Sequence, residues 1–420
     1  MKLAFIADGR SPTAQGWISL FIEQGHEVHL LSTFRCAPLA GVASQYFISV
    51  GFSSMGKRGE SGTFRAPGGA QGIGLRSVVR HWLGPLTIPY AAMQVRSILE
   101  TLDVDLVHSL RIPFEGMLGA FARPKVPLVV SVWGNDFTLH ARSSPGMAIH
   151  TRQTLTRADA LHTDCKRDIR LAADWGFRED RPVIILPGGG GINRDLFKPA
   201  PPVMESIRPE VQAQLGNLSA DTPVVVNPRG FRAYVRNDTF FRSIPSIVEK
   251  IPAAIFLCPA MAGEEEAERW LDQLKIKRSV RLLPKLSQEE MAMVYRMSTV
   301  IVSPSEHDGT PNTFLEAISS GCFPVVGDIE SLREWVADGE NGFLVDPDAP
   351  KSLARATSRA LKDTNLRQAA GMINQNLIAE RADRGNVAIS AARFYEDVAA
   401  RGITKASKAD VNSVSMIDDT

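Results

Sequence analysis

The amino-acid sequence predicts an α/β protein with two doubly wound halves, each built on a mainly parallel sheet. Short apolar runs rich in Val, Ile and Leu alternate with segments of helical spacing along most of the chain. Proline and glycine interrupt this alternation up to a break near 195–205, after which it resumes. A chain of 420 residues also exceeds what one hydrophobic core usually serves. We therefore predict one domain over 1–198 and a second over 199–385.

The composition narrows the class of protein. Hydrophobic residues make up 44% of the chain and charged residues 22%, which is typical of soluble globular proteins. The 47 basic residues nearly cancel the 46 acidic ones, so the formal net charge of +1 gives no reason to expect a nucleic-acid partner. Four scattered cysteines without CxxC spacing indicate neither a zinc site nor a disulfide framework. The opening apolar run is too short for a signal peptide and no later run approaches spanning length, so we expect a cytoplasmic protein.

The first half opens with a βαβ unit. Residues 3–7 are predicted as a buried strand, 17–24 as a helix and 27–32 as the next strand. The loop from Asp8 to Gly16 leaves the carboxyl end of the first strand, where open α/β sheets place their ligands. It lacks the GxGxxG spacing of a dinucleotide site. Further strands are predicted at 104–107, 128–132, 158–161 and 183–186.

A second loop of interest is Trp133-Gly134-Asn135-Asp136, which follows the strand predicted at 128–132. Gly134 lets the backbone approach a ligand closely, and Asp136 lies where the end of a strand opens into a cleft. Asp136 equally suits an Asx turn or a helix cap. The glycine run 187–191 is not followed by Lys-Ser or Lys-Thr, so we interpret it as the approach to an interdomain linker rather than a P-loop.

Residues 51–89 differ in character from the rest of the first half. Glycines punctuate most of this segment and predict a long loop. The loop passes into residues 75–83, a short basic stretch with apolar residues at helical spacing, which is the pattern of a segment that lies on an anionic membrane. The alternative, that Trp82 and its neighbours are ordinary core under a surface helix, is favoured by the short length of the stretch.

The second half restarts the alternation of strands and helices. Strands are predicted at 223–227, 255–258, 280–283, 299–303, 322–326 and 342–345. Between the fourth and fifth of them lies the segment 308–316, where a turn with Gly309 leads into a helix that Pro311 begins and Gly321 ends.

Segment 308–316 carries the chemistry that points to a sugar-nucleotide site. The first N–H groups of the helix and the positive end of its dipole face the loop, where they can hold an anion such as a diphosphate. Asp308 in the loop and Glu316 in the helix are hydrogen-bond acceptors for a polyol. The alternative is that Asp308 only serves the turn and that Glu316 lies on a solvated helix face.

With these residues in hand, the chain resembles the retaining GT-B glycosyltransferases of family 4 over nearly its whole length. The donor motif of that family has two acidic residues with seven between them, and Asp308 and Glu316 have that separation, although Asp stands where Glu is more usual. Residues 303–305, 315–317, 328–336 and 339–342 are similar to the flanks of the motif. The opening strand with 25–28, the Trp133–Asp136 loop and residues 185–197 are also similar to the family's pattern.

The resemblance implies a GT-B fold, with two Rossmann-like domains that face each other across a cleft, and roles for several residues. Arg229 matches the arginine that pairs with the donor diphosphate, a task that suits a planar guanidinium. The usual Lys-Gly that follows is absent, and Arg236 is the nearest candidate for a second cation or is a surface arginine. Asp308 would orient the sugar and Glu316 the ribose. The backbone of Gly309, Thr310, Pro311, Asn312 and Thr313 would receive the phosphates, and Asp136, Trp133 and Gly16 would line the acceptor side.

The implied activity is transfer of a sugar from a nucleoside diphosphate sugar to an acceptor hydroxyl with retention. No metal and no cofactor are expected, and the acceptor is a glycan, a lipid-linked molecule or a small molecule, with possible contact to the inner face of a membrane. Residues 386–400 would form the last helix, which in this family returns to the first domain. Residues 403–420 are polar and are predicted as a mobile tail.

Two other functions compete with transfer. A binding protein that has kept the fold and lost turnover fits the Asp at 308 and the missing Lys-Gly. A dinucleotide-dependent oxidoreductase is disfavoured because the glycine fingerprint is absent.

Overall fold

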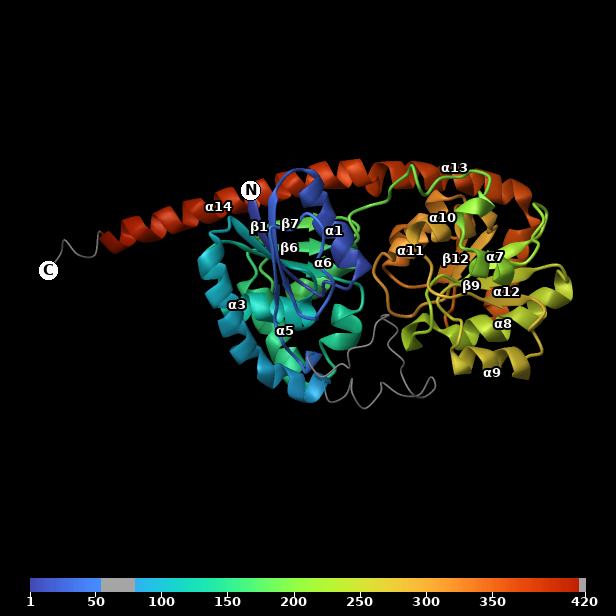
Figure 1. Ribbon diagram of the computed structural model, residues 1–420, viewed down its shortest axis with the longest axis horizontal. Coiled ribbons are helices and arrows are strands. Elements are labelled where there is room, and N and C mark those ends of the chain that lie inside the picture. Colours follow the sequence, from blue (N-terminus) through green and yellow to red (C-terminus); the bar gives the residue numbers. More distant parts are fainter. Residues whose placement is uncertain (54–79, 415–420) are drawn as a thin grey trace. The chain divides into compact units, whose positions relative to one another are not determined.

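The computed structural model describes residues 1–53 and 80–414, with the last of these, 403–414, described by backbone alone. The chain forms two compact units, shown in Figure 1. Unit 1 contains the described residues up to Gly191 together with the C-terminal helix from Gly385, and unit 2 is Ile192–Arg384. The division thus falls before 198/199, because residues 192–197 pack with unit 2. Ile192 donates to the carbonyl of Ala382 at 2.7 Å, and Phe197 is buried in the unit 2 core.

Unit 1 is built on a seven-stranded sheet in the order β3-β2-β1-β4-β5-β6-β7, with all neighbouring strands parallel. The strands are β1 Lys2–Ala7, β2 Glu27–Ser32, β3 Ser44–Phe47, β4 Leu106–Ser109, β5 Leu128–Val132, β6 Ala160–Thr163 and β7 Val183–Ile185. The longer helices are α1 Pro12–Glu23, α3 Ile88–Leu102, α4 Met117–Ala122, α5 Pro145–Arg157, α6 Lys166–Asp174 and α14 Arg384–Val414. Short helical segments are η2 Gly84–Thr87, η3 Ile112–Gly116 and η4 Asp136–His140.

Both faces of this sheet are covered by helices, as expected for a doubly wound fold. Helices α3, α4 and α5 contribute to one apolar cluster, and helices α1 and α14 contribute to the other. In the second cluster Tyr395 of α14 stacks on Phe21 of α1, with ring centroids 4.3 Å apart, and lies beside Phe5 of β1. The C-terminal helix is therefore part of the unit 1 core.

Unit 2 repeats the same plan with a six-stranded parallel sheet in the order β10-β9-β8-β11-β12-β13. The strands are β8 Val224–Val226, β9 Ile255–Cys258, β10 Val280–Leu282, β11 Val300–Ser303, β12 Phe323–Gly327 and β13 Phe343–Val345. The helices are α7 Pro209–Leu215, α8 Asn237–Lys250, α9 Glu265–Gln273, α10 Gln288–Met297, α11 Asn312–Ser319, α12 Pro350–Lys362 and α13 Thr364–Arg381. Short helical segments are η5 Met204–Ser206, η6 Ala233–Val235 and η7 Leu332–Glu334.

The prediction of two doubly wound α/β halves is confirmed, and the strands fall within about two residues of the apolar runs that predicted them. Helix α1 begins earlier than predicted because Ser11 caps it, accepting from the N–H of Ala14, and Pro12 occupies the first turn. Gly16 consequently lies in a helix and not in a loop. Strand β3 was not predicted, since its sequence Ser-Gln-Tyr-Phe has no apolar run.

Two further expectations differ from the structure. The chain is helical from Arg80 onward, so the predicted loop 51–89 ends earlier, and residues 54–79 lie outside the described part. The expectation that Trp82 packs in the core is wrong, because its side chain is 58% exposed. The backbone of 403–414, predicted as tail, continues helix α14, and residues 415–420 are not described. No helix in the described part of the chain combines the length and apolarity needed to cross a bilayer.

A buried chain of hydrogen bonds fastens α14 to the unit 1 sheet. Trp17 Nε1 donates to the Tyr395 hydroxyl at 3.0 Å, and that hydroxyl contacts His108 Nδ1. His108 Nε2 contacts Ser131 Oγ at 2.8 Å, Ser131 Oγ contacts His162 Nδ1 at 2.8 Å, and His162 Nε2 reaches the carbonyl of Leu186 at 3.0 Å.

The two ends of this chain decide its direction. An indole N–H can only donate and a carbonyl can only accept, so every group between them accepts from one neighbour and donates to the next. Both histidines are then neutral and carry their proton on Nε2. Burial acts in the same sense, since it lowers the pKa of His108 well below its usual value and that of His162 to about 4.

We expect Tyr395→Phe to destabilise unit 1 by about 1–3 kcal/mol, because it leaves Trp17 Nε1 and His108 Nδ1 buried without their common partner. Denaturant unfolding followed by circular dichroism measures the change. Tyr90→Phe is the matched control, since Tyr90 is 66% exposed, and its stability should equal that of the unaltered protein. Equal midpoints for both variants would show that the chain contributes nothing to stability.

Candidate functional site

The candidate donor site lies where the crossover direction of the unit 2 sheet reverses. The chain passes from β8 outward through β9 to β10 and then returns to the other side of β8 as β11. In open α/β sheets this switch point separates the loops at the carboxyl ends of the two central strands and leaves room for a ligand. Arg229 lies in the loop that follows β8, and Asp308 lies in the loop that follows β11.

Arg229 and Asp308 form a two-pronged ion pair. Arg229 Nη2 donates to both carboxylate oxygens of Asp308, at 2.7 and 2.9 Å, and Nη1 donates to Thr313 Oγ1 at 3.3 Å. The two charged side chains are only 10% and 12% exposed. The structure therefore brings together three of the predicted residues, one after β8, one after β11 and one in the first turn of α11.

Two buried asparagines hold the loop that carries Arg229 by hydrogen bonds. Asn227 accepts from the N–H of Arg229 at 3.3 Å and donates to Asn237 Oδ1 at 3.3 Å. Asn237 in turn donates to the carbonyl of Gly230 at 3.1 Å, and Gly230 has a φ of 64° that favours glycine. These contacts hold the guanidinium at the sheet edge.

The loop that carries Asp308 is held by the segment 328–336. Ser331 Oγ donates to the carbonyl of Asp308 at 2.7 Å, and Trp335 Nε1 donates to Thr310 Oγ1 at 3.0 Å. Strand β12 passes close beneath, since a Cβ at Gly327 would lie 2.2 Å from the carbonyl oxygen of Ser305. The loop is thus constrained before any ligand arrives.

Helix α11 begins directly after this loop. Pro311 is its N-cap, one position before the predicted first turn, and has no side chain that can accept a hydrogen bond. Gly321, with a φ of 99°, follows the last turn as predicted. The positive end of the helix dipole therefore faces Gly309, Thr310 and the Arg229–Asp308 pair, with Asn312 and Thr313 in the first turn.

Glu316 lies one turn beyond Thr313, on the same side of α11. The Tyr295 hydroxyl of α10 donates to Glu316 Oε2 at 3.3 Å. Burial raises the pKa of Glu316 to about 7, and the hydrogen bond from Tyr295 opposes that shift. Tyr295 is itself fully buried, and burial raises its pKa well above the usual value. Near neutral pH the Glu316 carboxyl can therefore accept or donate a hydrogen bond.

Arg236 does not join this group. It ion-pairs with Asp238 at 3.0 Å, with Glu306 at 3.4 Å and with Asp348. Three carboxylates therefore surround one guanidinium, so a phosphate would meet net negative charge there. The proposed use of Arg236 as a second phosphate-binding cation has no support from these contacts.

The acceptor-side candidates lie in unit 1, at the carboxyl edge of its sheet. Asp136 is 1% exposed, and its carboxylate accepts from Arg111 at 2.8 Å and from the N–H groups of Ile112 and Trp133 at 2.9 and 3.2 Å. Asp136 therefore ties the loop after β5 to the loop after β4. This contact favours the structural alternative over direct acceptor contact.

Gly16 and Trp133 meet around the glycine run 187–191. A Cβ at Gly16 would lie 2.5 Å from the carbonyl oxygen of Gly189, and one at Gly188 would lie 3.2 Å from Trp133 Nε1. The run that was interpreted as a linker approach is therefore packed between α1 and the Trp133 loop. Only glycine permits this approach of backbone to backbone.

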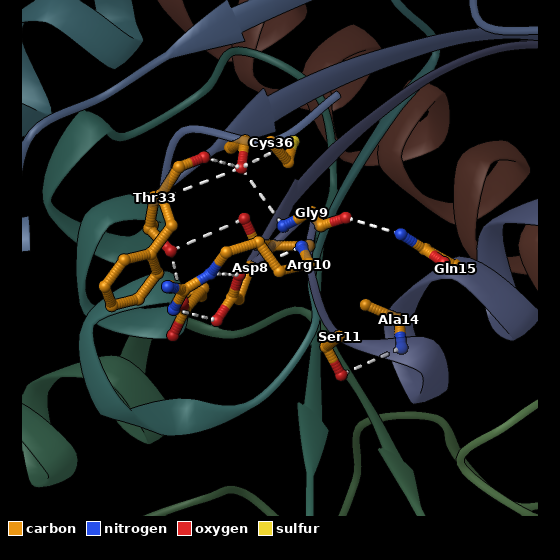
Figure 2. Close-up of polar contacts among 12 residues, drawn as sticks. Asp8, Gly9, Arg10, Ser11, Ala14, Gln15, Thr33 and Cys36 are labelled. Carbon is orange, nitrogen blue, oxygen red and sulfur yellow. Dashed lines mark hydrogen bonds and ion pairs between the residues drawn. The ribbon is translucent and has the colours of Figure 1, made fainter. Parts of the chain in front are cut away.

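A cluster of arginines lies at the same edge and was not predicted. Figure 2 shows Arg10 paired with Asp8 after β1, where two hydrogen bonds of 3.0 and 2.9 Å join the side chains. Arg10 also stacks on Phe34, 3.6 Å from the ring centroid, and Arg80 lies over the same ring at 4.8 Å. Arg80 belongs to the basic stretch 75–83 and Arg111 had no motif around it in the sequence, and only the fold brings them to one edge.

Glu115 is buried and interacts electrostatically with Arg111 and Arg80. Its carboxylate accepts from Thr33 Oγ1 at 2.6 Å, and burial raises its pKa to about 7 despite the nearby charge of Arg111. In unit 2, the sequence analysis did not identify Tyr295 as a site residue. Its only signal was a tyrosine among the apolar residues of a predicted helix.

Comparisons with known proteins decide the family. Residues 216–376 match the family described as "Glycosyl transferases group 1", and residues 9–188 match the "Glycosyl transferase 4-like domain". The chain belongs to the glycosyl transferases of group 1. The resemblance stated above is thereby confirmed, and the two matches lie almost wholly within units 2 and 1 respectively.

Among curated relatives of this group 1 chain, a D-inositol 3-phosphate glycosyltransferase of Thermomonospora curvata is 25% identical over 291 residues, which are 64% of this chain and 66% of the relative. The same enzyme of Streptomyces griseus is 25% identical over 201 residues, 44% of this chain and 42% of the relative. The matches thus cover less than two thirds of these relatives.

Solved structures share the fold of the chain. Sucrose-phosphate synthase of Thermosynechococcus elongatus superposes with a TM-score of 0.72 at 16% identity, over 96% of this chain and all of the other. Anabaena HepE, solved with UDP-glucose, gives a TM-score of 0.68 at 16% identity, over 94% of this chain and all of the other. These similarities show a GT-B fold for this group 1 member.

The raised pKa of Glu316 predicts a pH-dependent stability. The folded chain keeps this proton up to about pH 7, whereas the unfolded chain releases it near 4.5, so the contribution of Glu316 to the free energy of unfolding falls as pH rises from 4.5 to 7. Over that range the loss amounts to a few kcal/mol. Glu316→Gln removes it, so the stability difference between variant and parent should change sharply across this window and be constant above it.

Denaturant unfolding at a series of pH values tests this prediction. Glu115→Gln is the matched control, since it removes the equivalent contribution of a buried glutamate in unit 1 and leaves that of Glu316. Parallel stability curves for Glu316→Gln and its parent would contradict a protonated Glu316.

Proposed function

We propose that the chain is a retaining glycosyltransferase that moves a sugar from a nucleoside diphosphate sugar to an acceptor hydroxyl. The observation that carries this proposal is the group formed by Arg229, Asp308 and Thr313 at the switch point of unit 2 and at the start of α11. A fixed guanidinium beside the positive end of a helix suits a diphosphate leaving group. Three solved structures of Anabaena HepE, one of them with UDP-glucose, support a nucleotide-sugar donor by similarity.

In this reaction the bond between the anomeric carbon and the diphosphate oxygen breaks, and a bond from that carbon to the acceptor oxygen forms. A nucleoside diphosphate and a proton are released. Negative charge grows on the diphosphate as it departs, so cations and N–H donors fixed in advance lower the barrier. Arg229 and the backbone N–H groups of Gly309, Thr310, Asn312 and Thr313 take this role, and no metal or cofactor is invoked.

The ion pair gives Asp308 two successive roles. In the free protein its carboxylate neutralises Arg229. Phosphate oxygens compete for the same guanidinium, and a carboxylate released from Arg229 becomes an acceptor for sugar hydroxyls. We assign the ribose hydroxyls to Glu316, which lies one turn after Thr313 on α11 and accepts from the Tyr295 hydroxyl. The acceptor is assigned to unit 1 and remains a glycan, a lipid-linked molecule or a small molecule.

Asp in place of the usual Glu at 308, together with the enclosed Arg236, also fits a protein that binds nucleotide sugars without turnover. Incubation with a panel of UDP, GDP and ADP sugars separates the two functions. Release of nucleotide with transfer supports the enzyme, and binding alone supports the binding protein.

Arg229→Ala should reduce sugar transfer by at least about 100-fold, since one fixed donor to the developing charge is lost. Glu316→Ala should abolish transfer as well, through lost ribose binding. Arg178→Ala is the control, because Arg178 forms a similar pair with Asp180 at 2.6 Å on the surface of unit 1. Turnover by a coupled assay of released nucleotide and melting temperatures by circular dichroism are measured together. Folded variants of Arg229 and Glu316 that both keep turnover would overturn the assignment.

Asp308→Asn should bind the free nucleoside diphosphate several-fold more tightly than the parent, because Arg229 no longer has a competing carboxylate. The same variant should lose most of its transfer activity, because a neutral amide replaces the acceptor for sugar hydroxyls. Isothermal titration with UDP, GDP and ADP measures the first effect. Asp328→Asn, which alters an exposed carboxylate paired with Arg333, is the control. Unchanged diphosphate affinity in Asp308→Asn would exclude the exchange of partners.

A further inference from the structure

The helical segment 82–93 in unit 1 carries several exposed apolar side chains. These are Trp82, Leu83, Leu86, Tyr90 and Met93, which we call the apolar stripe. Their exposed fractions run from 48% at Leu83 to 76% at Leu86, the most exposed large apolar side chain among the described residues. Tyr90 and Met93 lie three residues apart on one side of α3, while Leu86 lies in η2 and Trp82 and Leu83 lie in the helical turn before it. Figure 1 shows α3, in light blue, along the outer edge of unit 1.

The stripe has no role in packing the helix. Helix α3 is already anchored by its opposite face, where Ile88, Ala91, Ala92, Val95 and Leu99 are buried. Most surface helices are apolar on one face and polar on the other. A helix that is apolar on both faces is expected where it separates two apolar environments, and a contiguous exposed apolar patch marks an interaction surface.

The charge around the stripe is positive. Residues 80–99 contain no Asp or Glu, and neither do residues 137–158, which include α5; the first acidic residue of α3 is the exposed Glu100, one turn after Arg96. Helix α5 is joined to the stripe at its start, since Ser144 Oγ donates to the carbonyl of His81 at 2.7 Å and Gly146 approaches Pro85. The exposed residues of these two helices and of the turn before α5 include Arg96, Arg142, Ile149 and Arg152, of which Arg152 also lies 6.0 Å from the ring centroid of Trp175.

We propose that the apolar stripe, with these flanking arginines, docks unit 1 onto a bilayer that contains anionic phospholipid. Trp and Tyr favour the level of the lipid headgroups, Leu and Met enter the acyl boundary, and arginines pair with lipid phosphates. Each basic residue near an anionic surface strengthens binding by roughly five-fold. A protein partner of ordinary surface charge would not require two long segments free of acidic residues. The docking surface does not depend on sugar transfer.

The surface is continuous with the carboxyl edge of the unit 1 sheet. Arg80 directly precedes the stripe and lies over Phe114 at 4.4 Å and over Phe34 at 4.8 Å from the ring centroids. Phe34 follows β2 and also stacks with Arg10 of the loop after β1. A bilayer held at the stripe therefore lies next to the loops assigned to the acceptor.

The full-length protein should co-sediment with vesicles of phosphatidylcholine and phosphatidylglycerol at least about ten-fold more strongly than with phosphatidylcholine alone. Added salt should weaken this binding. The double variant Leu86→Glu with Tyr90→Glu should lose about ten-fold or more of it, since charges replace apolar groups at the acyl boundary. The matched control is Met372→Glu with Ile373→Glu, which alters two exposed apolar residues of α13 and should bind as the parent does.

Two further measurements keep the outcome decisive. Arg142→Ser with Arg152→Ser leaves the stripe intact and should remove most of the preference for anionic vesicles. Light scattering after gel filtration, without lipid, should give the same mass for parent and Leu86→Glu with Tyr90→Glu. Equal binding to both kinds of vesicle, equal binding by the stripe variant, or a dimer that the stripe variant dissociates would each overturn the proposal, the last by identifying a second copy as the occupant.

Discussion

The pairing of Arg229 with Asp308 is the interaction on which the candidate site depends. The two residues end up together because β8 and β11 are parallel neighbours whose carboxyl ends meet at one edge, where the crossovers diverge. A guanidinium that is largely buried requires an anion, and in the free protein the carboxylate supplies it. A ligand must therefore offer oxygens that match a planar fork at least as well, as phosphate does. The Asp308 carboxylate therefore makes the site selective for ligands that can replace it on Arg229.

The support around this pair explains why the residues can act together. Backbone atoms of both loops are tied by Asn227, Asn237 and Ser331, and Trp335 fixes Thr310. These supporting groups hold the loops, while the paired side chains still have room to change partners. The contact between α14 and the unit 1 sheet differs from the site in this respect. Each group between Trp17 and Leu186 in the buried hydrogen-bond chain has a partner on both sides. That arrangement resists change, as a structural contact between the C-terminal helix and the sheet should.

Much of the fold followed from the sequence because buried parallel strands are continuous apolar runs, and those runs need no tertiary information to be recognised. The Asp308–Glu316 segment was also predictable, since a strand, a glycine turn and a helix start follow one another directly. The three ion pairs of Arg236 were not predictable, because two of the carboxylates, those of Glu306 and Asp348, are distant in sequence. Arg80 and Tyr295 likewise contact residues that are distant in sequence, and Arg10 pairs with the nearby Asp8 but stacks on the distant Phe34. Trp82 was misjudged because the apolar spacing of a helix does not say which of its faces meets the core.

The exposed face at Trp82 has a consequence for the choice of acceptor. A surface with several exposed apolar side chains gives no advantage to a protein whose substrates all diffuse in water, and it adds the danger of self-association. It gives an advantage when the acceptor is itself confined to a bilayer, since docking replaces a search in three dimensions by one in two and raises the effective concentration at the site. The stripe adjoins Arg80 and, through Phe34, the arginine-rich edge of the unit 1 sheet. Of the three acceptor classes that fit the sequence, a lipid-linked molecule with an anionic headgroup is the one for which both features, the apolar stripe and the arginines, have a purpose.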